Sequence, residues 1–141
     1  MININPYFNF MGNTEEAMNF YKSVFGGTFT TFQRFRDIPG GEKMAPEEQN
    51  KIIHITLTTP SGHVFMATDF LVSMGQSLIA GNNCRITLHT ASIDESNQIF
   101  ERLSLGANIE MPMNNTFWGA YCGMLTDRFG IQWMINFTLK N

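Results

Sequence analysis

The chain has 141 residues, of which 43% are apolar and 15% are charged, and its formal net charge is −3. This length and composition are typical of one globular domain and exclude a disordered chain. Lys and Arg nowhere form a basic run, so we expect no nucleic-acid partner. No 18 apolar residues occur in succession, so we expect no membrane-spanning segment.

The N-terminal stretch MININPYFNF has neither a basic start nor a long apolar core, so we expect no signal peptide. Cys84 and Cys122 lack the Cys-x-x-Cys spacing of redox and zinc motifs. Without a secretory signal, both are expected to be reduced, unreactive thiols. These features predict a cytoplasmic protein.

The first predicted module covers about residues 3–70. Residues 7–10 alternate in polarity and predict a strand. Asn13, followed three positions later by Glu16, is a capping-box pattern that predicts the start of a helix. The glycine pair at 26–27 predicts the end of that helix.

Two further segments complete this module. Residues 37–50 contain a Pro-Gly-Gly sequence and a polar run, and we interpret them as an inserted loop. Residues 57–66 then predict a strand, a glycine-containing turn and another strand.

The second predicted module covers about residues 83–139, after a linker at about 71–82. Residues 86–89 predict a strand, and the Ser92 to Glu95 pattern predicts a capping box at the start of a helix. Gly106 then predicts the end of this helix. Residues 125–134 predict a second hairpin.

The two modules are copies of one pattern. The helix starts align at an offset of 79 residues and the hairpins at an offset of 68. Each module therefore reads as a βαβββ unit, and the fold class is α+β. Because four strands and one helix cannot cover both faces of a sheet, we expect the pair to form one domain, a cup-shaped sheet with the helices outside.

Four segments carry a family resemblance: PYFNFMGNTEEAMNFYKSVFGG (6–27), TPSGHVFMATD (59–69), Gly81-Asn82-Asn83 and NTFWGAYCGMLTDRFGIQWMIN (115–136). Together with the tandem modules, they resemble the PhnB-like branch of the vicinal-oxygen-chelate superfamily, which includes glyoxalases, bleomycin-resistance proteins and dioxygenases. The branch is sometimes named after demethylubiquinone methyltransferase. The resemblance implies a glyoxalase-like scaffold.

Methyl transfer is not expected from the residues themselves. Enzymes that bind S-adenosylmethionine hold it at a glycine-rich turn between a strand and a helix. Here the glycine pairs at 26–27 and 40–41 end a predicted helix and lie in the inserted loop.

The resemblance also implies where a metal would bind. In metal-dependent members, each module supplies one ligand from its first strand and one from its last. The repeat places these positions at Pro6 and Arg85 and at Met66 and Met134. Proline has no donor atom, arginine is a permanent cation, and a thioether is a poor ligand for Ni, Zn, Mn or Fe. We therefore predict no metal and no other cofactor.

Aromatic, methionine and cationic side chains predict a pocket in the cup for a planar or amphipathic anion. The alternative is that these aromatics only fill the core, and His54 points either into the cup or to solvent. The pocket candidates are Asn9, Arg34, His54, Met66, Arg85, Trp118, Tyr121 and Met134.

Three functions follow from these observations. The leading prediction is a metal-independent small-molecule binding protein, and a homodimer is expected from the resemblance. The second is an enzyme of the same superfamily, either with a metal held by other residues or with His54 as a base. The third is an interaction module with an exposed apolar patch.

Overall fold

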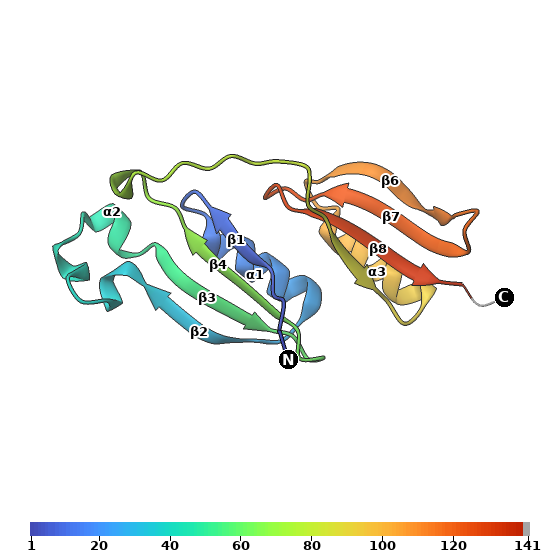
Figure 1. Cartoon of the computed structure of the whole chain (residues 1–141), viewed down its shortest axis with the longest axis horizontal. Coiled ribbons are helices and arrows are strands. Elements are labelled where there is room, and N and C mark those ends of the chain that lie inside the picture. Colours follow the sequence, from blue (N-terminus) through green and yellow to red (C-terminus); the bar gives the residue numbers. More distant parts are fainter. Residues whose placement is uncertain (140–141) are drawn as a thin grey trace. The chain divides into compact units, whose positions relative to one another are not determined.

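The computed structural model describes residues 1–139. Its contacts divide the chain into two compact units, Met1–Ile79 and a second unit that begins at Ala80. Figure 1 shows a sheet and a helix in each unit.

The first unit contains a four-stranded sheet in the order β1-β4-β3-β2, in which β1 and β4 are parallel and the other pairs antiparallel. Its main elements are β1 (Tyr7–Phe10), α1 (Thr14–Phe25), β2 (Thr28–Arg34), β3 (Ile52–Thr58) and β4 (Val64–Asp69). Short helical turns lie at η1 (Phe35–Asp37), η2 (Gly41–Lys43), α2 (Pro46–Gln49) and η3 (Val72–Met74).

The second unit repeats this arrangement, with strand order β5-β8-β7-β6 and a parallel β5–β8 pair. Its elements are β5 (Ile86–His89), α3 (Ile93–Leu103), β6 (Asn108–Asn115), β7 (Ala120–Thr126) and β8 (Gln132–Thr138). The predicted α+β class and the two βαβββ modules are therefore confirmed.

The 68-residue offset of the hairpins is also confirmed. The Thr59 backbone N–H donates to the His63 carbonyl at 2.8 Å, and the Asp127 N–H donates to the Ile131 carbonyl at 2.8 Å. Each bond closes a turn of the same length, because both pairs are four residues apart. The two hairpins are thus equivalent residue by residue.

In the first unit, α1 covers one face of the sheet (Figure 1). Its apolar residues recur at helical spacing, so they lie on one side of the helix and are buried there. The strands contribute alternate residues to the same core. The buried set comprises Ala17, Met18, Tyr21 and Val24 from the helix and Phe8, Phe10, Ile55, Leu57, Phe65 and Ala67 from the sheet.

The predicted capping box at Asn13 does not form, because the Asn13 side chain makes no capping hydrogen bond. Instead, the Thr14 N–H donates to Oδ1 of Asp69, at the end of β4, at 3.0 Å. In the second unit the prediction is partly right: Oγ of Ser92 accepts from the Glu95 N–H at 3.0 Å. The returning Glu95 carboxylate accepts from the Ala91 N–H, one residue before the cap.

The inserted segment at 37–50 is more ordered than the predicted loop. It contains η2 and α2. Pro46 is the first residue of α2, where the backbone N–H has no partner within the helix, so the N–H that proline lacks is not needed. Gln49 in α2 donates to the carbonyls of Glu42 and Met44. The segment is thus folded on itself by local hydrogen bonds.

The first strands align at an offset of 80, whereas the helix starts align at 79. Tyr7 lies opposite Met66, and Thr87 lies opposite Met134. By this pairing Asn9 lies four residues before the Asn13 cap, whereas the equivalent His89 lies three residues before the Ser92 cap, so the first unit has one more residue between strand and helix. This extra residue corrects the predicted first-strand metal positions, which become Tyr7 and Thr87 in place of Pro6 and Arg85.

None of the helices in residues 1–139 combines the length and hydropathy that crossing a bilayer requires.

Candidate functional site

The face of the first sheet opposite α1, called the open face below, carries most of the exposed polar groups of its strands. Side chains alternate between the faces of a strand, so those between the buried core residues point away from the helix. Tyr7, Met66 and Thr56 lie side by side on β1, β4 and β3. The full set on these strands is Tyr7, Asn9, His54, Thr56, Thr58, Val64, Met66 and Thr68.

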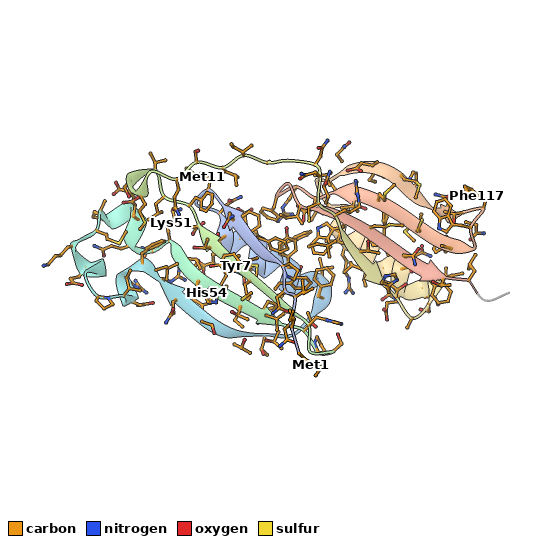
Figure 2. The ribbon with its side chains drawn as sticks, viewed as in Figure 1. Met1, Tyr7, Met11, Lys51, His54 and Phe117 are labelled. Carbon is orange, nitrogen blue, oxygen red and sulfur yellow. The ribbon has the colours of Figure 1, made fainter. Side chains whose placement is uncertain are left out.

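Three of these side chains form a hydrogen-bonded chain. The Tyr7 hydroxyl lies 3.3 Å from Nδ1 of His54, and the Thr56 hydroxyl lies 3.0 Å from Nε2 of the same ring. The Tyr7 and His54 rings are also in contact, with centroids 5.7 Å apart. Figure 2 shows the two side chains on the sheet, reaching toward each other from different strands.

The chain of hydroxyl, imidazole and hydroxyl is reachable from solvent in the first unit. Tyr7 is 46% exposed, and His54 and Thr56 are half-buried. A neutral imidazole has one N–H and one acceptor nitrogen, so one flanking hydroxyl donates to the ring while the other accepts from it. The arrangement is suited to binding a polar group and to moving a proton.

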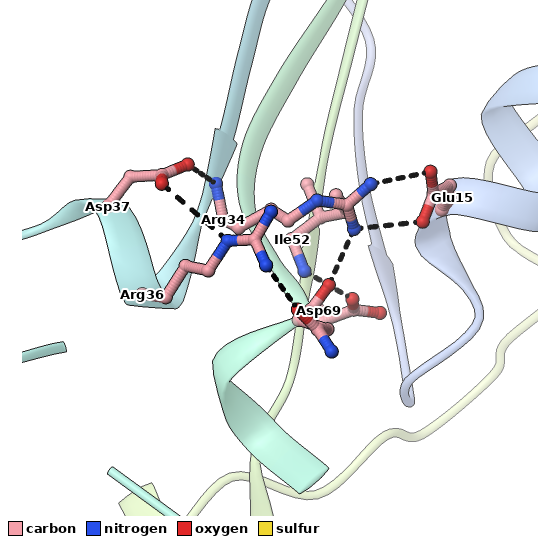
Figure 3. Close-up of polar contacts among 7 residues, drawn as sticks. Glu15, Arg34, Arg36, Asp37, Ile52 and Asp69 are labelled. Carbon is pink, nitrogen blue, oxygen red and sulfur yellow. Dashed lines mark hydrogen bonds and ion pairs between the residues drawn. The ribbon is translucent and has the colours of Figure 1, made fainter. Parts of the chain in front are cut away.

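Arg34 lies on the opposite side of the sheet from this chain. Its guanidinium makes a two-pronged ion pair with the Glu15 carboxylate of α1, at 2.9 and 2.8 Å, and also donates to the Asn50 carbonyl (Figure 3). The Arg34 hydrogen bonds lower the pKa of Glu15, although burial opposes the shift. Arg34 is therefore held by the helix, and the structure does not place it with His54.

Arg85 is similarly engaged, in the second unit. It donates to the Trp133 carbonyl at 3.1 Å and forms an ion pair with Glu110 on β6. The Thr126 hydroxyl donates to the same carboxylate and, together with Arg85, lowers the pKa of Glu110. This network connects the segment before β5 to β6, β7 and β8.

The remaining candidates of the second unit have different surroundings. The Tyr121 hydroxyl donates to Oδ1 of Asn97 on α3 at 2.6 Å, so Tyr121 points toward the helix. Trp118 lies in the β6–β7 turn and is 56% exposed. Its ring packs edge-on against the Phe117 ring, with the ring centroids 4.9 Å apart. Met134 lies in register with Met124 and Thr87 and is half-buried.

The structure thus brings together three of the candidates on one face: Asn9, His54 and Met66. Thr68, which was not a candidate, lies beside them opposite Asn9. Two residues that complete this site, Tyr7 and Thr56, were missed from the sequence. Thr56 could have been found, since it lies two residues from His54 and so shares its face. Tyr7 had no such signal, because its contact with His54 spans 47 residues and an intervening strand.

The side chains do not fit the divalent metal that the superfamily implies. The corrected positions hold the Tyr7 phenol, the Thr87 hydroxyl and the thioethers of Met66 and Met134, which lack imidazole and carboxylate donors. Across residues 1–139, no group of three or more His, Cys, Asp or Glu side chains is arranged to hold a metal ion.

The paired βαβββ units place this chain among the glyoxalase-like folds. A glyoxalase/bleomycin resistance protein/dioxygenase family enzyme from Burkholderia phytofirmans PsJN matches it with a TM-score of 0.62 at 20% identity, over 94% of this chain and 97% of that one. At this identity the likeness shows the fold alone.

Closer relatives define the branch. Protein PA1353 from Pseudomonas aeruginosa is 34% identical, with a TM-score of 0.85 over 99% of this chain and all of that one. The PhnB protein from Bacillus cereus is 26% identical, with a TM-score of 0.72 over 97% and 100%. Protein YjdN from Escherichia coli K12 is 27% identical, over 94% and 93%.

Residues 2–136 match the family model described as 3-demethylubiquinone-9 3-methyltransferase. The chain belongs to this family, the PhnB-like branch of the glyoxalase/bleomycin resistance/dioxygenase superfamily. The description is a label of the family and does not establish methyl transfer by this chain.

Proposed function

We propose that the chain binds a small organic molecule, without a metal ion, on the open face of the first sheet. The observation that carries the proposal is the Tyr7–His54–Thr56 chain, whose polar atoms are reachable and converge on one ring. The neighbouring Met66 supplies a flexible apolar surface that adapts to a ligand. The Tyr7 ring, 46% exposed, supplies a flat surface for stacking.

Native mass spectrometry and elemental analysis of protein purified without chelators test this proposal. We expect a retained organic mass and no stoichiometric metal. Tyr7→Ala removes the stacking ring and is expected to abolish retention. His63→Ala, an exposed histidine in the β3–β4 turn, is the control and is expected to retain the compound. Stoichiometric Ni, Zn, Mn or Fe would contradict the proposal.

A second candidate function is favoured by the same contacts. His54, with a hydroxyl at each ring nitrogen, has the surroundings of a general base that acts without a metal. Incubation of the retained compound with fresh protein separates the two functions. Conversion to a new mass by the wild type, lost in His54→Gln while binding persists, would establish the enzyme; an unchanged compound supports the binding protein.

A further inference from the structure

We infer that the open face binds an anionic oxygen of its ligand at the Tyr7–His54–Thr56 chain, and that binding takes up one proton on His54. The ligand class is therefore an organic anion with an apolar ring or chain. This inference rests on the proposed function, which it extends by naming the charge of the ligand and the group that recognises it.

Neither candidate arginine is available to a ligand on the open face. The guanidinium of Arg34 is occupied by Glu15 and the Asn50 carbonyl, and that of Arg85 by Glu110 and the Trp133 carbonyl. Each guanidinium holds both a carboxylate and a backbone carbonyl, so either one would have to give up both partners to reach a ligand. An anion on the first sheet must therefore be recognised by other groups.

The open face carries no negatively charged side chain on β1, β3 or β4. The one carboxylate at the end of these strands, Asp69, is buried and accepts from the Thr14 and Ile52 N–H groups on the helix side. A protonated His54 would thus be an uncompensated positive charge, which an anion stabilises.

The protonation state of His54 sets the direction in which the Tyr7 and Thr56 hydroxyl groups donate. When the imidazole is neutral, one hydroxyl must donate its hydrogen to the acceptor nitrogen. When His54 is protonated, both ring nitrogens donate, and the Tyr7 and Thr56 hydroxyls both accept from the ring. Both O–H groups are then free to donate outward. Protonation therefore produces a positive charge and two hydroxyl donors at one place, which is the combination that an anionic oxygen requires.

The groups that surround His54 carry no carboxylate and no ammonium or guanidinium group. Tyr7 faces it from β1, Gln33 lies opposite it on β2, and Met66 and Thr68 lie on β4. Of these only Tyr7 carries an ionisable group. The nearest cation along β3, Lys51, donates to the Gly12 carbonyl.

Two dyes of nearly equal shape test the inference. 8-Anilinonaphthalene-1-sulfonate is an anion at every pH used, and N-phenyl-1-naphthylamine is its neutral counterpart. Imidazole is the side-chain group whose charge changes between pH 5 and pH 8. We expect the dissociation constant of the anionic dye to rise by roughly 20-fold between pH 6.0 and pH 8.0, and that of the neutral dye to stay constant.

Variants locate the effect. In His54→Gln, the anionic dye is expected to bind weakly and equally at both pH values, while the control His63→Gln keeps the wild-type pH dependence. Tyr7→Ala is expected to weaken both dyes. Calorimetry at pH 7.0 in two buffers with different ionisation enthalpies counts the protons taken up when the anionic dye binds. Net proton uptake is expected in the wild type and not in His54→Gln.

The outcomes separate the two proposals. If Tyr7→Ala weakens both dyes but the anionic dye shows no pH dependence, the proton linkage is overturned and the binding face remains. If neither dye binds the wild type, or Tyr7→Ala changes neither, the proposed binding face is overturned, and the inference with it.

Discussion

Asp69 connects three elements of the first unit through one buried carboxylate. It ends β4, is 2% exposed, and accepts from the first N–H of α1 at 3.0 Å and from the first N–H of β3 at 2.8 Å. Figure 3 shows its place near the Arg34 ion pair. A carboxylate suits this position because it accepts at both oxygens, and a negative charge is favourable at the N-terminus of a helix.

The Asp69→Asn substitution tests whether the Asp69 carboxylate connects these three elements. The amide retains one acceptor oxygen but turns an NH₂ group toward a backbone N–H donor, in a buried site. We expect the free energy of unfolding to fall by about 2–3 kcal/mol, as for a lost hydrogen bond to a charged group. Urea unfolding measures it. The control is Asp94→Asn on the exposed start of α3, with an expected change within about 0.5 kcal/mol; equal losses would contradict the assigned role.

At the scale of elements, the Arg34–Glu15 ion pair fastens the end of β2 to the first turn of α1. Arg34 is also within 4.9 Å of the Phe32 ring centroid on the same strand. The pair is partly exposed, with 20% of the Arg34 side chain and 44% of the Glu15 side chain accessible. Its contribution is therefore limited by solvent screening, to less than about 1 kcal/mol.

The pH dependence of this pair follows from the lowered pKa of Glu15. A carboxyl with a lower pKa in the folded protein contributes stability above its unfolded pKa of 4.5. That contribution is lost as the pH falls through the folded value. Glu15→Gln is thus expected to be less stable than the wild type at pH 7, with the difference disappearing in more acidic solution. Urea unfolding at several pH values, with the exposed Glu16→Gln as control, measures this.

At the scale of the whole molecule, the chain contains two chemically different copies of one unit. The open face of the first sheet carries Tyr7, His54 and several threonines; the corresponding strands of the second carry Met124 and Met134 with the Arg85–Glu110 pair. Duplicate backbones with different side chains allow one copy to bind a ligand while the other takes a different role.

A homodimer remains a prediction at this scale. Large apolar side chains are exposed on the single chain, among them Phe117 at 98% and Trp118 at 56%. Side chains of this size are enriched at protein interfaces. Light scattering coupled to size-exclusion chromatography is expected to give twice the chain mass of 16.0 kDa. A mass of one chain at micromolar concentration would contradict the prediction.

The sequence alone determined most of the elements, because their signals are local. Glycines at positive φ end α1 and close the hairpin turns, and polarity alternates along the strands. The extra residue before Asn13 was not visible, since it changes the register by one position without disturbing either element. The predicted first-strand metal positions were therefore displaced, by one residue from Tyr7 and by two from Thr87, although the residues at the corrected positions lead to the same interpretation.

The tertiary structure decided which face each side chain occupies. Alternation along a strand shows that Phe32 and Arg34 share one face of the sheet and that His54 and Thr56 share one face. It does not show which of the two faces a helix covers. Packing of α1 settles this: it directs Arg34 to Glu15 and leaves His54 on the open face. The contact between Tyr7 and His54 depends on a parallel β1–β4 pairing that brings together residues 47 positions apart, and no local pattern encodes such a pairing.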